Sequence, residues 1–206
     1  MTQIAFPTPD PDILARRDDI ISGLAALLPP ECLITSEDER RAYETDALTS
    51  YRRLPLAVVL PRSTQEVSAV LCYCHSQGVK VVPRGAGTSL AGGAIPQEDA
   101  IVIGVSKMNR ILEIDYANRM ARVESGVTNL SITDHVMPEG FFYAPDPSSQ
   151  LACTIAGNIG MNSGASAGQT IFHCHIHLIP RRNGDVENPK GGIRHLIPGK
   201  GYYDAT

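Results

Sequence analysis

Alternating apolar runs and amphipathic stretches divide the first half of the chain into helices and strands. Residues 12–28 have the apolar spacing of a helix that ends before two prolines. The apolar run at 57–61 predicts a buried strand, and residues 63–78 predict an amphipathic helix that opens with a Ser-x-x-Glu capping box. The runs at 79–83 and 100–105 predict two more strands. This order predicts that the strands at 57–61 and 79–83 run parallel.

The pattern changes in the second half. Residues 110–115 and 120–125 flank a turn and predict a hairpin, and residues 128–140 predict a helix that ends at a glycine. Pro, Ser and Gly then dominate until residues 170–180, where apolar and polar residues alternate as in a strand. We therefore expect an α+β or α/β fold with a small, mostly parallel sheet and helices, followed by a further strand and a tail.

Composition and charge narrow the classes of function. The chain has 206 residues and a net charge of −4 with interspersed signs, which argues against a nucleic-acid partner. Its apolar runs fall short of the ~20 residues of a membrane-spanning helix. The N-terminus, MTQIAFPTPDPDI, does not have the pattern of a signal peptide. The five cysteines suggest no disulfide framework, so we expect a reducing, cytoplasmic setting.

The clearest chemical motif is the glycine-rich stretch PRGAGTSLAGGA at residues 83–94, directly after a predicted strand. Glycines allow positive φ and close backbone approach, so successive N–H groups can turn inward and hold a diphosphate. The stretch lacks the Gly-Lys-Ser/Thr ending of a Walker loop. It also has Leu90 where the Rossmann fingerprint requires its third glycine. As a bare loop, it is compatible equally with anion binding and with simple turn formation.

Residues from about 40 to 163 resemble the FAD-linked 2-hydroxyacid dehydrogenases of the p-cresol methylhydroxylase type, a family that includes the FAD-linked subunit of glycolate oxidase. The matching stretches, in order, are LAVVLPRSTQEVSAVL, VPRGAGTSLAGGA, ILEID with ARVESGVTNL, and YAPDPSSQLACTIAGNIGMNSG. The resemblance implies the N-terminal part of an FAD-binding domain of this type. It implies FAD as cofactor and hydride transfer from the α-carbon of a 2-hydroxy acid to flavin N5. We expect the substrate domain to be missing, so turnover would need other subunits.

The same resemblance implies a set of cofactor-binding residues. In the glycine loop, where the family holds the FAD pyrophosphate, these are Arg84, Gly85, Ala86, Gly87, Thr88, Ser89, Gly92 and Gly93. Along the PDPSS and CTIAGN stretches they are Pro145, Asp146, Ser149, Thr154, Gly157 and Asn158. Asp46 and Tyr51 lie where the family has an ordered entry loop, and we expect a structural role for both.

A second motif, HCHIH, places His173, His175 and His177 on one face of the strand predicted at 170–180. Three interpretations compete. The imidazoles could bind zinc, they could form a nucleophilic site that attacks phosphorus, or they could be incidental polar residues. We predict no metal site.

The histidine spacing, together with residues 160–203 as a whole, resembles the histidine triad nucleotide hydrolases and transferases. This resemblance implies that His175 is a nucleophile forming a nucleotidyl-histidine intermediate, with support from His173. It also implies contacts to phosphate or ribose from His177, Asn162, Gln169 and Thr170. The family's N-terminal half has no counterpart in residues 1–156.

Taken together, the motifs predict three segments. Residues 1–50 form a helical lead-in, residues 51–163 a partial FAD-binding domain, and residues 164–206 a segment like the histidine triad proteins. The leading hypothesis is a truncated FAD-binding oxidoreductase of the glycolate oxidase or D-2-hydroxyacid dehydrogenase type. The alternatives are a nucleoside phosphoramidate or dinucleotide hydrolase, and an inactive fusion or truncation product.

Overall fold

The structure is a computed structural model, and it describes residues 6–143, 151–162 and 176–180. The chain forms two compact units, Met1–Met108 and Asn109–Thr206. This division differs from the predicted segment boundaries after residues 50 and 163, which stay a prediction.

The helices of the first unit begin at polar caps and end where the sequence stops supporting them. They are α1 (Pro11–Ala15), α2 (Arg17–Ala25), α3 (Glu37–Arg40) and α4 (Thr64–Gln77), with the 3-10 turns η1 (Pro30–Cys32) and η2 (Arg41–Tyr43). The side chain of Ser63 accepts a hydrogen bond from the Glu66 N–H at the start of α4, and Gly78 ends the helix with φ +69°. The single helix expected over 12–28 is divided at Arg16, whose ψ of 15° departs from helical geometry.

The sheet of the first unit is mostly parallel, as predicted. Its strands lie in the order β1 (Leu33–Ile34), β2 (Ala57–Val59), β4 (Ala100–Gly104) and β3 (Lys80–Arg84). Strands β2 and β3 both pair in parallel with β4, and β1 pairs antiparallel with β2. The predicted parallel direction of β2 and β3 is confirmed, although β4 lies between them. Because the three strands are parallel, the carboxyl ends of β2, β3 and β4 share one edge of the sheet.

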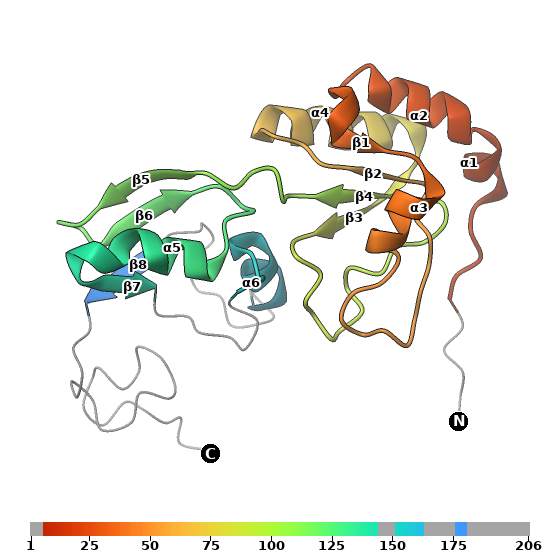
Figure 1. Cartoon of the computed structure of the whole chain (residues 1–206). Helices are drawn as coiled ribbons and strands as arrows, with labels where there is room; N and C mark the ends of the chain where they lie inside the picture. Colours follow the sequence, from red (N-terminus) through yellow and green to blue (C-terminus); the bar gives the residue numbers. More distant parts are fainter. Residues whose placement is uncertain (1–5, 144–150, 163–175, 181–206) are drawn as a thin grey trace, which may run out of the picture. The chain divides into compact units, whose positions relative to one another are not determined.

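Apolar residues cover both faces of this sheet. On one face, Ile20 and Leu24 of α2 and Val70 of α4 belong to a buried cluster with Ile101 of β4, and α1, α2 and α4 lie along this side (Figure 1). On the other face, Val58 and its strand neighbours pack against partly buried residues that include Tyr43. Every residue of β2 and β4 is buried, as expected for central parallel strands.

The second unit is built on an antiparallel sheet. Its strands lie in the order β5 (Ile111–Asp115), β6 (Met120–Val123), β8 (Ile176–Pro180) and β7 (Phe141–Tyr143), and its helices are α5 (Asn129–Val136), the 3-10 turn η3 (Met137–Glu139) and α6 (Ile155–Asn162). The β5–β6 hairpin and the helix α5 confirm the sequence predictions. Val127, Ile132, Val136 and Ile155 are buried together with Ala121 of β6. The mixture of a parallel and an antiparallel sheet with helices confirms the expected fold class.

Two elements of the second unit were not predicted from the sequence. The Pro-, Ser- and Gly-rich stretch before residues 170–180 predicted no helix, but residues 155–162 form α6. Thr154 explains the start of this helix, because its hydroxyl oxygen accepts a hydrogen bond from Gly157 N–H at 3.3 Å. Strand β7 is only three residues long and has a uniform, half-buried pattern without alternation.

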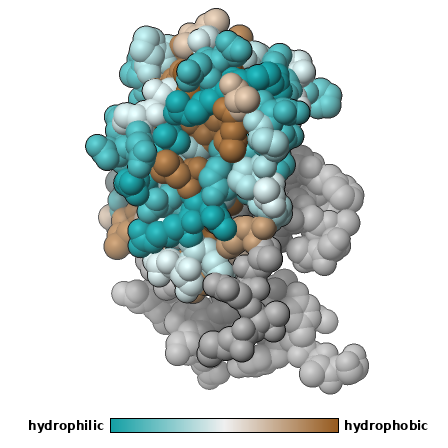
Figure 2. Space-filling model, turned by 90° about the vertical axis from the view of Figure 1, so that its right-hand side faces the viewer, coloured by the Kyte–Doolittle hydropathy of each residue, from teal (hydrophilic) through white to brown (hydrophobic). Residues whose placement is uncertain are grey.

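The surface in Figure 2 is mainly hydrophilic, with apolar residues in small groups between polar ones. Among the described residues of the first unit, the exposed large apolar side chains are Leu14, Leu27, Leu71 and Leu90. Scattered apolar side chains of this kind are usual on folded proteins. Among the described residues, no helix is both long and apolar enough to cross a membrane.

Candidate functional site

The glycine loop begins where β3 ends. Arg84 is the last residue of β3, and its carbonyl accepts a hydrogen bond from Val105 N–H at 3.1 Å, just after β4. The chain then leaves the sheet at the edge that carries the carboxyl ends of the parallel strands. Ligands of open α/β sheets bind at such edges, so the loop occupies a suitable place for a cofactor.

The backbone of the loop is shaped for contact with an anion. Gly87 and Gly92 have φ of +73° and +74°, a region that favours glycine. Within the described part of the chain, Gly85, Ala86, Gly87 and Thr88 donate no backbone hydrogen bond. Free N–H groups in consecutive residues are the donors that a phosphate group requires.

The side chain of Arg84 packs against the backbone of the glycine loop. Its guanidinium donates to the carbonyl oxygen of Thr45 at 2.7 Å and lies over the ring of Tyr43, 5.5 Å from the centroid. A Cβ placed on Gly87 would lie 2.2 Å from Nη2 of Arg84, so the loop backbone rests directly against the guanidinium. Only glycine permits this approach. The arrangement brings a positive charge to the base of the loop.

Burial perturbs the titratable groups behind the loop. It lowers the pKa of Arg84, while Tyr43 and Asp46 act in the opposite direction. Burial also raises the pKa of Tyr43, and the nearby Arg84 partly offsets that effect. Arginine keeps its proton even when burial lowers its pKa, so the site offers a fixed positive charge beside a neutral phenol at neutral pH.

The contact between the segment after η2 and the glycine loop was not predicted from the sequence. Ala47 N–H donates to the carbonyl of Ser89 at 3.1 Å, and Thr45 accepts from Arg84, so this segment contacts the glycine loop twice. The two segments are about 40 residues apart in the sequence, and no local pattern links them. The structural role expected for Asp46 agrees with its nearly complete burial, at 4% exposure.

The second group of predicted cofactor residues lies around the start of α6. Thr154 is buried and bonds to Gly157, and Asn158 donates through Nδ2 to Oδ1 of Asn129 at 2.5 Å. The N–H of Asn129 in turn donates to the carbonyl of Cys153 at 3.4 Å. These contacts fix the segment that begins α6. Predicted residues Pro145, Asp146 and Ser149 lie outside the described residues.

The predicted histidine site can be placed only in part. His173, His175, Gln169 and Thr170 lie outside the described residues, and Asn162 is the last residue of α6. His177 lies in β8, opposite Met120 of β6. Because β8 also pairs with β7, the strand that carries His177 is an integral part of the antiparallel sheet of the second unit. Among the described residues, no cluster of His, Cys, Asp and Glu could hold a metal ion.

Comparison with known proteins identifies the family. A family model described as an FAD binding domain matches residues 55–177. The glycolate oxidase subunit GlcD of Escherichia coli K12 is 43% identical over 148 residues, covering 72% of this chain and 30% of that protein. GlcD of Bacillus subtilis is also 43% identical, over 192 residues that cover 91% of this chain and 40% of that protein. The chain therefore spans well under half of the length of these curated relatives.

Solved structures show the same fold. The p-cresol methylhydroxylase structure with substrate bound matches with a TM-score of 0.65 at 20% identity, over 76% of this chain and 30% of that one. An alkyldihydroxyacetonephosphate synthase matches with a TM-score of 0.61 at 21% identity, over 78% of this chain and 30% of that one.

These matches also bear on the histidine run. The family model extends to residue 177 and so includes HCHIH, and the comparisons lend the histidine triad interpretation no support. The glycine loop, its place at the carboxyl end of a parallel strand and the matches to GlcD all indicate an FAD-binding domain. The chain belongs to the FAD binding domain family, and it shares the fold of p-cresol methylhydroxylase.

Proposed function

We propose that this chain binds FAD through the glycine loop and serves in the oxidation of a small 2-hydroxy acid. The observation that carries the proposal is the run of free N–H groups from Gly85 to Thr88, braced by Arg84 at the end of a parallel strand. The relatives' names, glycolate oxidase subunit and D-2-hydroxyglutarate dehydrogenase, support 2-hydroxy acids as the substrate class.

Each part of the loop has a distinct task in this proposal. The backbone N–H groups of Gly85–Thr88 donate to the pyrophosphate oxygens, and the hydroxyls of Thr88 and Ser89 add further donors. Gly92, with its positive φ, lets the chain turn back toward β4. Arg84 holds Gly87 in place and contributes positive charge, which favours a dianionic group nearby. Ala86 has a side chain small enough to leave the phosphates accessible.

The residues of the second unit remain proposed contacts to the same cofactor. Thr154 uses its hydroxyl to cap α6, so we assign it to positioning Gly157 and Asn158. Pro145, Asp146 and Ser149 complete this proposed set on the strength of the family resemblance. When bound, the flavin supplies a hydride acceptor for the α-carbon of the substrate. The protein's contribution is to bind and orient it.

Turnover requires more protein than the described units provide. The chain covers 30–40% of the GlcD proteins it matches, and GlcD is named as a subunit of glycolate oxidase. We therefore propose that other subunits or further segments supply the binding site for the hydroxy acid. The cytoplasmic location stays a prediction from the cysteine pattern.

Purification tests the binding step directly. The purified protein should be yellow, or become yellow on addition of FAD, and should release FAD on denaturation. The released flavin is identified by its absorbance and by chromatography against FMN and riboflavin. A folded, colourless protein that ignores added FAD would contradict the proposal. Glycolate-dependent reduction of the flavin, with and without a lysate fraction containing candidate subunits, then tests the reaction.

The histidine triad function remains a separate prediction that rests on sequence alone. It predicts release of AMP from a nucleoside phosphoramidate, with loss of activity in His175→Ala and little change on substitution of His75. A wild-type protein that releases no AMP would end this alternative. The outcome does not depend on FAD binding, so both assays can be run on one preparation.

A further inference from the structure

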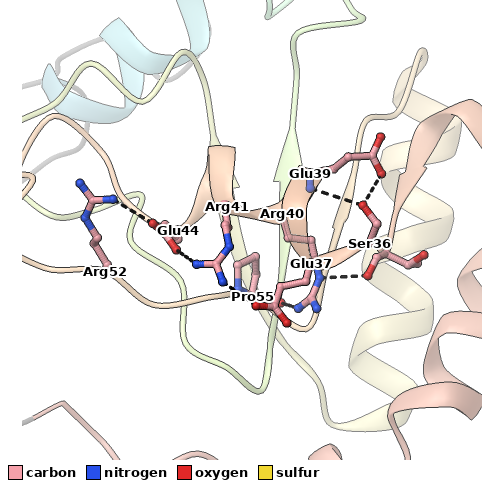
Figure 3. Close-up of polar contacts among 9 residues, drawn as sticks. Ser36, Glu37, Glu39, Arg40, Arg41, Glu44, Arg52 and Pro55 are labelled. Atoms are coloured by element: carbon pink, nitrogen blue, oxygen red, sulfur yellow. Dashed lines mark hydrogen bonds and ion pairs between the residues drawn. The ribbon is translucent and has the colours of Figure 1, made fainter.

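The segment after η2 forms a closed loop, residues 44–53, whose two ends meet at Glu44. The Glu44 carbonyl accepts from Arg53 N–H at 2.8 Å, and its carboxylate accepts from Arg52 at 3.0 Å. Arg41 lies 3.8 Å from the same carboxylate and 2.6 Å from Glu37 (Figure 3). The side chain of Glu44 is only 12% exposed, so these contacts are partly shielded from solvent. The base of the loop is therefore held together without help from the glycine loop.

A second anchor fixes the chain on either side of this closed loop. The buried side chain of Arg40 donates through Nε to the Thr35 carbonyl at 3.0 Å and through Nη1 to the Pro55 carbonyl (Figure 3). Arg40 thus ties the segment that precedes the loop to the segment that follows it. Together the two anchors fix where the tip of the closed loop lies.

The tip of the closed loop lies against the glycine loop. Thr45 O accepts from Arg84, and Ala47 N–H donates to Ser89 O. A Cβ on Gly92 would lie 3.5 Å from Cδ2 of Leu48, so that side chain also reaches the glycine loop. Asp46 occupies the position between the two residues that make the backbone contacts.

Asp46 has one satisfied and one unsatisfied carboxylate oxygen. Oδ1 accepts from Leu48 N–H at 2.9 Å, a local turn that shapes the tip. Oδ2 is buried and has no hydrogen-bond partner among the described residues. Leaving a buried carboxylate oxygen without a donor is costly, and such groups are rare in folded proteins. The nearby charge of Arg84 offsets part of this cost but gives Oδ2 no hydrogen bond.

We propose that Asp46 is a ligand-binding residue whose Oδ2 accepts a hydrogen bond from a sugar-type hydroxyl beside the pyrophosphate of FAD. The inference rests on the proposed function and adds a recognition residue to it. A carboxylate oxygen requires a donor, and pyrophosphate oxygens are acceptors only, so the phosphates cannot satisfy it. The groups that flank the pyrophosphate in FAD, the ribityl chain and the adenosine ribose, both carry hydroxyls.

The substitution Asp46→Asn distinguishes the loss of a hydrogen bond to FAD from a change in charge and from a change in local structure. Asparagine keeps the oxygen that accepts from Leu48, so the turn should persist and the apoprotein should melt at or above the wild-type temperature. Removing a negative charge next to the pyrophosphate site should, by Coulomb's law alone, tighten FAD binding. The lost charge-assisted hydrogen bond should instead raise the Kd for FAD about tenfold or more.

Asp99→Asn is the matched control. Asp99 is the other buried carboxylate of the first unit with an unpartnered oxygen, and it pairs with Lys80 at 2.7 Å. Lys80 begins β3 whereas Arg84 ends it, so Asp99 lies near the opposite end of that strand from the glycine loop. Asp99→Asn should lower the melting temperature and leave the Kd for FAD unchanged.

Titrations of wild type and Asp46→Asn with FAD and with ADP identify the hydroxyl. An equal loss for both ligands assigns it to the ribose, and a loss for FAD alone assigns it to the ribityl chain. An unchanged or lower Kd for FAD in Asp46→Asn would overturn the proposal. If wild type itself fails to bind FAD, the proposed function fails first.

A test on the wild-type protein avoids any effect of the variant on folding. FAD analogues that lack one sugar hydroxyl each should include one that binds about tenfold more weakly than FAD. Binding of all these analogues with the affinity of FAD would also overturn the proposal.

Discussion

Replacing Gly87 by alanine tests how tightly the glycine loop is fitted to Arg84. The backbone φ of +73° is a left-handed conformation that costs an L-amino acid about 1–2 kcal/mol. The new Cβ would also lie 2.2 Å from Nη2 and 2.5 Å from Cζ of Arg84, so the guanidinium must move. Its movement strains or breaks the 2.7 Å hydrogen bond to Thr45, a charged contact worth about 1.5–3 kcal/mol. We expect Gly87→Ala to lower the free energy of unfolding by about 2–4 kcal/mol.

The same substitution should weaken cofactor binding, because the displaced loop no longer presents its N–H groups together. We expect the Kd for FAD to rise at least tenfold, measured by the change in flavin fluorescence on titration, with unfolding followed by circular dichroism in urea. Gly78→Ala is the control for backbone strain, since Gly78 has φ +69° but nothing within 4 Å of its Cβ position. It should cost about 1–2 kcal/mol and leave the Kd unchanged.

Gly93→Ala is the control for substitution within the loop. Gly93 has neither a positive φ nor a neighbour within 4 Å, so the change should have little effect on stability. A Gly87→Ala protein that loses no more stability than Gly78→Ala and binds FAD as wild type does would refute the tight fit of Gly87 against Arg84.

Three further predictions concern the first unit. Burial alone would raise the pKa of Asp99, but hydrogen bonds from its lysine partner and from a backbone N–H hold that pKa below its usual value. The contribution of Asp99 to stability should therefore be complete above the ordinary carboxyl pKa of about 3.9 and should fade as the pH falls further. In a plot of unfolding free energy against pH, Asp99→Asn should make the fall at acid pH less steep. Ser63→Ala should lower the unfolding free energy by about 1 kcal/mol in urea titrations by removing the cap of α4, and an unchanged value would contradict the capping role. Burial raises the pKa of Cys74 to about 11, so this thiol should be unreactive in the native protein. In a Cys174→Ser background, a thiol reagent should modify exposed Cys72 in the native protein and Cys74 only after unfolding. Peptide mass spectrometry identifies the modified cysteine.

Local signals explain which parts of the fold the sequence predicts. Ser63 and Gly78 mark the ends of α4 because a cap and a left-handed glycine act within one turn of the helix. The hairpin β5–β6 is likewise a short-range structure. The position of β4 between β2 and β3 depends on contacts between distant segments, so the local pattern indicated direction but not order.

The unpredicted elements have weak local signals. Helix α6 includes Gly157 and Gly160, which lower helix propensity, and its start depends on the side chain of Thr154. The candidate site shows the same limit. The glycine loop is visible in the sequence as a motif, but its support by Thr45 and Ala47 arises only when the chain folds.

Hydrogen exchange of the glycine loop tests the central claim most directly, because it reports on the backbone N–H groups that are proposed to hold the pyrophosphate. Exchange is followed by mass spectrometry on peptides that cover residues 84–93, with a peptide over the buried strand β2 (Ala57–Val59) as the internal reference. Saturating FAD should slow exchange at Gly85–Thr88, which donate no backbone hydrogen bond in the described structure. Bound FAD with unchanged exchange at these residues would contradict the account.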